Sequence, residues 1–174
     1  MPLRITDEIK QTRPFASKSA EAAVALMRTA DLVRRAIGGV VENAGITLQQ
    51  YNVLRILRGS GPKGLPTLEI AERMIEQAPG ITRLIDRLEA KHLVARERCS
   101  TDRRQVFCCI TTEGLGLLDS LNEPMRSVEA SALGTLCEEH VSQLLGILDT
   151  TREAIHAAMT TSPQANHQPR SSHR

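Results

Sequence analysis

A chain of 174 residues is long enough for one domain with a hydrophobic core and marginal for two. Its 22 Lys and Arg residues against 20 Asp and Glu residues leave a formal net charge of +2, so the molecule is no polycation, and nucleic-acid binding would need locally concentrated positive charge. Aromatic residues make up 2% of the chain, which argues against recognition of single strands by base stacking.

The cysteine content and the N-terminal stretch indicate a reducing compartment. Four cysteines are enough for two disulfides, but the first residues, MPLRITDEIKQTRPF, lack the apolar core of a secretory signal. We therefore expect a cytoplasmic protein with reduced thiols. No stretch approaches 18 uninterrupted apolar residues, so we expect no membrane span and no membrane partner.

The first part of the chain predicts an arm and then a long helix. Residues 1–17 are polar without a clear period, and we expect an N-terminal arm there. Gly45 suits a left-handed helix cap. Over residues 18–46 we predict a helix that packs on another helix, because apolar residues recur at alternating spacings of three and four: Ala23, Leu26, Ala30, Val33, Ile37 and Val40.

Two further helices should follow. Thr47 and Gln50 fit a capping box, in which each side chain satisfies a free backbone N–H group of the other residue. That helix should turn Leu48, Tyr51, Leu54 and Leu57 inward and end in the turn 59–62. Thr67, directly after Pro66, is expected to cap a shorter helix that extends to Ile75.

The next helix is predicted to have one buried and one exposed face. Pro79 should lie in its first turn, where the missing N–H group costs nothing. The sequence PGITRLIDRLEAKHLV predicts a buried stripe of Ile81, Leu84, Ile85 and Leu88 and an opposite face of Thr82, Arg83, Asp86 and Arg87.

A β-hairpin is predicted after this helix. Residues 93–98 and 105–110 are β-type runs on either side of a turn at 100–103, which would place Cys99 near Val106 and Cys108 near Glu97. Between residues 73 and 104, eight basic residues against five acidic ones give a local balance of +3. The whole order predicts a winged helix-turn-helix lobe at residues 47–112, in a mainly α chain with a small β-hairpin wing.

The C-terminal part predicts helices that associate with another chain. Thr111 should cap a helix, and residues 113–160 should form C-terminal dimerisation helices. The apolar stripes of the terminal helices could pack on each other within one chain, but a winged-helix module rarely works as a monomer. We therefore expect a homodimer interface made of Ala23, Leu26, Ala30, Val33, Val141, Leu144, Leu148 and Ile155. The tail at residues 161–174 has no apolar period and is predicted to be disordered.

Three stretches of the chain together resemble the MarR family of winged helix-turn-helix transcription regulators. They are TLEIAERM, ITRLIDRLEAKHLVARE and TDRRQVFCCITTEG, and the resemblance covers roughly residues 18–159. It implies a homodimer that binds a pseudo-palindromic duplex DNA operator, most often as a repressor that a small ligand or oxidation releases. Tyr51 and the aliphatic faces of the first two helices are the candidates to line an effector site.

The resemblance also implies roles for single residues. Arg104 matches the wing arginine that enters the minor groove, where the negative potential favours a guanidinium, and Asp102 matches the acid that positions it. Arg87 and Arg103 are expected to contact phosphates. The family often has glycine where this chain has His92, so His92 should adopt a left-handed conformation. The residues that match the family's contacts to bases and phosphates are Gln77, Ala78, Pro79, Gly80, Thr82 and Arg83.

The cysteines offer a weaker functional hypothesis. Cys108 and Cys109 are adjacent, so they should point to opposite faces of a strand, with one of them lining the core. We keep redox sensing by Cys99 and Cys108 as a minor hypothesis, because neighbouring arginines would lower the pKa of Cys99. Cys137 and His140 lie one helical turn apart without a second pair at zinc spacing, so we predict no metal and no cofactor.

Two other classes of function compete with the regulator. An enzyme is the poorer competitor, because the sequence has no glycine-rich phosphate loop, no nucleophile elbow and no plausible catalytic set. A winged-helix protein-interaction module would have the same fold without specific DNA binding. The sequence therefore favours a homodimeric regulator that binds double-stranded DNA and is not an enzyme.

Overall fold

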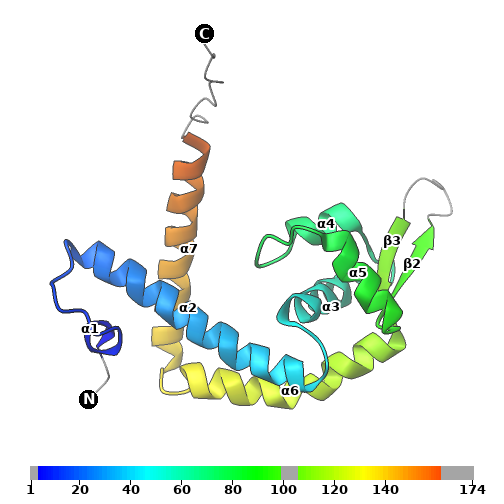
Figure 1. Ribbon diagram of the computed structural model, residues 1–174, viewed down its shortest axis with the longest axis horizontal. Helices are drawn as coiled ribbons and strands as arrows, with labels where there is room; N and C mark the ends of the chain where they lie inside the picture. Colours follow the sequence, from blue (N-terminus) through cyan, green and yellow to red (C-terminus); the bar gives the residue numbers. More distant parts are fainter. Residues whose placement is uncertain (1–3, 99–105, 162–174) are drawn as a thin grey trace, which may run out of the picture. The chain divides into compact units, whose positions relative to one another are not determined.

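The computed structural model describes residues 4–98 and 106–161 of the chain. It is mainly helical with a small antiparallel sheet, which confirms the predicted fold class (Figure 1). The chain divides into two compact units, residues 1–129 and 130–174. In chain order the elements are α1 (Ile5–Glu8), α2 (Lys18–Asn43), α3 (Leu48–Ser60), β1 (Leu65–Pro66), α4 (Thr67–Glu72), α5 (Ile81–Ala90), β2 (Val94–Arg98), β3 (Val106–Ile110), α6 (Thr112–Leu133) and α7 (Glu138–Thr161).

The ends of α2 and α3 form as predicted. Gly45 follows α2 with a φ of 77°, a left-handed conformation that glycine adopts without strain. Thr47 Oγ1 accepts from the Gln50 N–H group at 3.2 Å, and Gln50 Oε1 accepts from the Thr47 N–H group at 3.0 Å. The capping box is therefore confirmed, and it accounts for the burial of the polar Gln50 side chain.

The helix α4 is shorter than predicted. It ends at Glu72, so Ile75 lies beyond it and its side chain is 83% exposed. The prediction that Thr67 caps the helix is wrong, because Pro66 occupies the cap position and the Thr67 hydroxyl lies 3.8 Å from the Cys108 thiol. The unpredicted strand β1 explains this, since its pairing with β3 turns Thr67 toward the sheet.

The helix α5 begins later than predicted. Gly80 precedes it with a φ of 91°, and a helix cannot continue backwards through a left-handed residue, so α5 begins at Ile81 and Pro79 lies outside its first turn. The predicted buried stripe is confirmed, with Leu84, Ile85 and Leu88 buried and Ile81 packed against the core.

The sheet has the strand order β1-β3-β2, and all pairs are antiparallel. Arg96 pairs with Cys108 and Arg98 with Val106, so the predicted pairings of Cys108 with Glu97 and of Cys99 with Val106 are wrong by one residue. The turn itself lies outside the described residues, so the register is established by the pairing of β2 with β3 alone. A one-residue change of register exchanges the faces of a strand.

The hydrophobic core of the first unit joins α3, α4, α5 and α6 to the sheet. Its largest fully buried side chains include Leu54, Leu57, Ile70, Ile85, Leu88, Leu118 and the thiol of Cys108. His92 has a φ of 58°, which confirms the predicted left-handed conformation. Thr111 Oγ1 accepts from the Gly114 N–H group at 3.0 Å and donates to the His92 carbonyl at 2.7 Å, so Thr111 caps α6 as predicted and fixes it to the end of α5.

The second unit is dominated by α7, none of whose residues is buried. A shallow, mostly apolar groove runs along this helix and is lined by residues that include Gly146, Ile147, Ala154, Ile155 and Ala158. Among the described residues, no helix is long and apolar enough to cross a membrane.

Candidate nucleic-acid interface

The exposed face of α5 is the centre of the candidate interface. Thr82, Arg83, Asp86 and Arg87 are all exposed, on the side opposite the buried leucines and isoleucine. The burial of Leu84, Ile85 and Leu88 fixes the orientation of the helix about its axis. The polar face is therefore presented by a rigid element, as a surface that reads another molecule requires.

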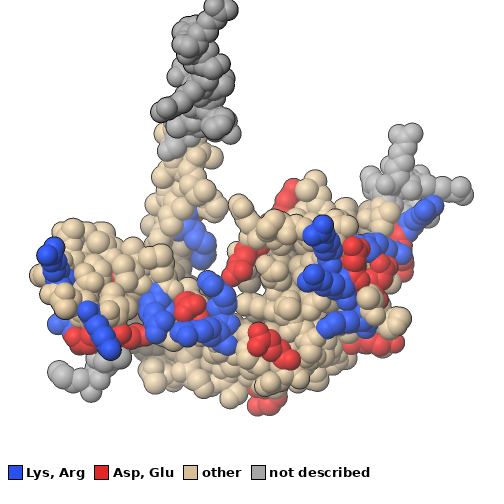
Figure 2. Space-filling model, viewed as in Figure 1, with Lys and Arg blue, Asp and Glu red and all other residues tan. Residues whose placement is uncertain are grey.

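Basic side chains follow this face along its length. Arg83, Arg87 and Lys91 are spaced four residues apart and so lie on one side of the helix and its end. Figure 2 shows a band of Lys and Arg side chains where Figure 1 draws α5, with Asp and Glu side chains beside it. Lys91 Nζ donates to the Gly45 carbonyl, and neither Arg83 nor Arg87 makes an ion pair within residues 4–98 and 106–161. These two guanidinium groups are available to an anionic partner.

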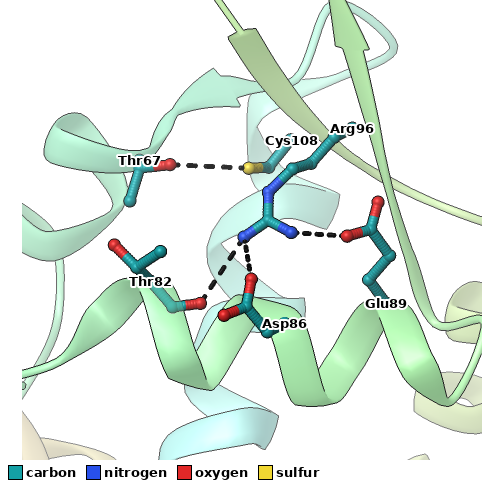
Figure 3. Close-up of polar contacts among 6 residues, drawn as sticks. All are labelled: Thr67, Thr82, Asp86, Glu89, Arg96 and Cys108. Atoms are coloured by element: carbon teal, nitrogen blue, oxygen red, sulfur yellow. Dashed lines mark hydrogen bonds and ion pairs between the residues drawn. The ribbon is translucent and has the colours of Figure 1, made fainter.

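The acidic side chains of α5 are held by an arginine of the hairpin. Arg96 of β2 lies between two of them: its Nη2 contacts Asp86 Oδ1 at 2.6 Å and its Nη1 donates to Glu89 (Figure 3). Its Nη2 also reaches the Thr82 carbonyl at 3.5 Å. Burial alone would lower the pKa of Arg96, but the hydrogen bonds to Asp86 and Glu89 outweigh it and raise that pKa. Arg96 thus joins α5 to the hairpin and offsets the charges that would repel a phosphate backbone.

The segment between α4 and α5 is exposed and is held by two polar contacts. Gln77, Pro79 and Gly80 are exposed, and Ala78 is half-buried. The Ile75 N–H group donates to Asn52 Oδ1 of α3 at 3.0 Å, and Glu76 Oε1 lies 3.0 Å from Arg34 Nε of α2. Within the described chain, no side chain caps α5, so its first N–H groups are open to an acceptor such as a phosphate.

The tip of the hairpin lies outside the described residues. This applies to Asp102, Arg103 and Arg104, which the family resemblance assigns to the wing, and to Cys99. What the structure describes is the base of the hairpin: β2 and β3 pair over five residues each, and the fully buried Cys108 anchors β3 in the core.

The three described cysteines form no disulfide with one another. Cys108, Cys109 and Cys137 are free, and full burial of Cys108 is the environment of a core thiol rather than of a reactive one. Burial, and next the charge of Glu97 and the neighbouring Cys108, raise the pKa of Cys109, which lowers its thiolate fraction at neutral pH. Among residues 4–98 and 106–161, no group of three or more His, Cys, Asp or Glu residues is arranged to hold a metal ion.

The residues predicted to form a dimer interface remain partly or fully accessible. Ala23, Leu26 and Ala30 of α2 are exposed and Val33 is half-buried, while on α7 Val141, Leu144 and Leu148 are half-buried and Ile155 is 52% exposed. Ile147, which the heptad pattern missed, is 63% exposed and lines the groove of α7. The groove and the predicted stripe share Ile155, and the centre of the groove lies roughly a quarter turn around the helix from the centre of the stripe.

The sequence did not point to Arg96, Asn52 or Glu76 as parts of the site. Arg96 was one of eight basic residues in a mixed stretch, and its partners on α5 follow from the register of β2, which the sequence did not establish. A signal for Asn52 existed, because asparagine is a poor residue for a helix interior and its presence in α3 indicates a specific contact.

Comparisons with known proteins agree with this geometry. A family model described as MarR family matches residues 46–106. The HTH-type transcriptional repressor MdtR of Bacillus subtilis is 34% identical over 71% of this chain and 77% of its own length. A crystal structure of a MarR transcription factor from Planctomyces limnophilus is 39% identical, with a TM-score of 0.60, over 79% of this chain and 99% of that one. The S. aureus MepR-DNA complex shares the fold, with a TM-score of 0.68 at 22% identity, over 76% of this chain and 96% of that one.

Proposed function

The chain belongs to the MarR family of DNA-binding transcription regulators, and we propose that it represses transcription by binding a pseudo-palindromic operator as a homodimer. It is a regulator and not an enzyme. The observation that carries the proposal is the division of α5 into a buried apolar face and an exposed face with unpaired arginines at positions 83 and 87 among the described residues. The MepR complex with DNA, which has the same fold, supports it.

In this proposal α5 lies in the major groove. Thr82 and Arg83, near its N-terminal end, reach base edges, and Arg87, one turn further on, contacts a phosphate. Gln77, Ala78, Pro79 and Gly80 bring the backbone of the preceding segment against the DNA. At the hairpin tip, we assign Arg104 to the minor groove, Asp102 to the positioning of Arg104, and Arg103 to a phosphate.

Two copies of the chain would supply two such surfaces. The exposed apolar residues of α2 and α7 support a homodimer, since an exposed apolar patch of this kind marks a site of association. The two-fold symmetry of a dimer then predicts half-sites about 10 bp apart, centre to centre. A small-molecule effector would release the operator, with Tyr51 as a candidate contact and oxidation of Cys99 as the minor alternative.

The test is a titration of the purified protein with duplex DNA from upstream of its own coding region, at several salt concentrations. We expect Arg87→Ala to weaken binding to every duplex and to lower the slope of log affinity against log salt by about 1. Arg83→Ala and Thr82→Ala should instead reduce the preference for the upstream DNA over an unrelated duplex.

The matched control removes an exposed arginine elsewhere. Arg126 of α6 is 74% exposed and pairs only locally with Glu123 in the described structure, so Arg126→Ala should bind DNA as the wild type does. A wild-type protein that binds DNA without salt dependence, or equal losses for Arg87→Ala and Arg126→Ala, would overturn the proposal. The same fold would then be a protein-interaction module.

A further inference from the structure

The segment that leads from α4 into α5 is connected to two other helices, α2 and α3. Its backbone is held by Asn52 of α3, whose Oδ1 accepts from the Ile75 N–H group at 3.0 Å. The side chain of Glu76 is held by Arg34 of α2, with 3.0 Å between Arg34 Nε and Glu76 Oε1. These contacts fall on consecutive residues, immediately before Gln77.

The remainder of the segment has little else to fix it. Ile75 is 83% exposed and so supplies no packing, and Gln77, Pro79 and Gly80 are exposed as well. Gly80 adopts a left-handed conformation, which glycine takes without strain. A segment with few buried contacts is easily displaced, so the two polar contacts weigh more here than they would within a packed element.

Arg34 also stands beside Val33, the last of the α2 residues that we assign to the dimer interface. α2 is one continuous helix from Lys18 to Asn43, so a movement of its interface residues is transmitted to the guanidinium of Arg34. The ion pair then conveys that movement to Glu76, one residue before the DNA-contacting segment.

We propose that Asn52 and Arg34 are positioning residues that set residues 75–80 for DNA, and that the ion pair of Arg34 with Glu76 makes DNA affinity depend on α2. This proposal rests on the proposed function. Neither residue needs to touch DNA, because each acts through the segment that it holds.

Removal of the charge of Glu76 tests the proposal, because positioning and simple electrostatics predict opposite changes in DNA affinity. Removal of a negative charge near DNA should strengthen binding if only charge matters. If Glu76 positions the segment through Arg34, Glu76→Gln should weaken binding about fivefold. Arg34→Gln should also weaken it about fivefold, and the double variant should lose no more than either single variant, because the same contact is removed in all three.

Asn52 is tested by a pair of variants of similar size. Asn52→Leu removes the acceptor and should weaken binding to the upstream duplex about tenfold, whereas Asn52→Asp keeps an acceptor for the Ile75 N–H group and should stay within about threefold of the wild type. Hydrogen exchange of the free protein gives a readout without DNA. The Ile75 amide should exchange faster in Asn52→Leu, while the amides of Ile85 and Leu88 keep their protection.

The outcomes distinguish this inference from the proposed function. If the wild type does not bind the upstream duplex, the proposed function fails, and unchanged exchange at Ile75 in Asn52→Leu would independently overturn the role of Asn52. If the wild type binds and the Arg34 and Glu76 variants show gains, no change or multiplied losses, the coupling through α2 is overturned while the proposed function stands.

Discussion

The helices α5 and α7 differ in where their apolar residues are placed: those of α5 are packed within the chain, and those of α7 are half-buried or exposed. Both carry apolar residues at helical spacing, yet α5 buries three of its ten residues in its own unit and α7 buries none of its 24. On α7, Leu145, Ile147, Ile155 and Met159 are between 52% and 71% exposed. Apolar periodicity therefore indicates that a helix needs a partner surface, without saying whether that surface belongs to the same chain.

The two helices also present different kinds of side chain to other molecules. α5 must present polar side chains in a fixed orientation, and this is possible only because its own unit supplies the core on the other side. α7 presents the apolar side itself, which is useful only to another polypeptide.

Charged residues in the groove of α7 should have the largest effect. Ile147→Lys combined with Ile155→Lys would bury two ammonium groups from each protomer in an apolar interface, and we expect at least about a 100-fold weaker dimer with a corresponding loss of operator binding. Sedimentation velocity at several protein concentrations measures the first, and titration with the upstream duplex measures the second. Ser142→Lys with Thr160→Lys adds the same charge on the opposite side of α7 as the control. A dimer that survives the isoleucine changes would place the interface elsewhere.

Truncation of a leucine on each helix should give unequal losses of stability. Leu88 of α5 is fully buried, so Leu88→Ala should lower the free energy of unfolding by about 2–5 kcal/mol. Leu145 of α7 is 57% exposed, and Leu145→Ala should change it by less than about 1 kcal/mol. Urea unfolding followed by circular dichroism compares the two. Equal losses would erase the contrast and show that Leu145 is covered in the assembled protein.

Ion pairs on the two helices should also differ, by a smaller amount. Arg96→Ala leaves Asp86 and Glu89 facing each other on α5 without a cation, and we expect a loss of about 1 kcal/mol in unfolding free energy together with weaker operator binding. Arg152→Ala removes an exposed pair with Asp149 within α7 and should leave stability unchanged. Arg96→Lys should recover only part of the loss, since an ammonium cannot span both carboxylates as the guanidinium does. Full recovery would mean that charge alone matters.

The cysteines should show the smallest effect, as a difference in rate of alkylation. Among the three described cysteines at neutral pH, we expect the exposed Cys137 to react first, Cys109 more slowly because its raised pKa lowers its thiolate fraction, and Cys108 only on unfolding. Because a raised pKa delays ionisation, the rate at Cys109 should keep rising as the pH increases into the alkaline range. Mass spectrometry of the labelled peptides gives the order, and a Cys108 that reacts as fast as Cys137 would show that the core around β3 opens.

Local signals predicted much of the fold. The capping box of Thr47 and Gln50, the left-handed Gly45 and His92, and the buried stripe of α5 are all confirmed, because each depends on residues close together in the sequence. The short strand β1 and the register of β2 against β3 were not predictable in this way. Both depend on pairing between segments far apart in the chain, and two residues are too few for an alternating pattern.

In the candidate interface, too, features that depend on nearby residues were predicted and contacts between distant residues were not. The exposed face of α5 follows from helical periodicity, and the family resemblance supplied the expected DNA contacts, which remain predictions. Arg96, Asn52 and Glu76 were missed because their partners lie 7 to 42 residues away, and only the folded chain brings them together. A residue that acts by positioning another carries no motif of its own.

The left-handed conformation of His92 lowers the free energy of unfolding below the value that this fold could reach. A residue with a side chain in that conformation is strained by about 1 kcal/mol relative to glycine, and His92 lies at the junction of α5, β2 and α6, where its carbonyl accepts from Thr111. The lobe is therefore a scaffold with unused thermostability, which a single exchange at the helix end could release without any change to its DNA-facing surface.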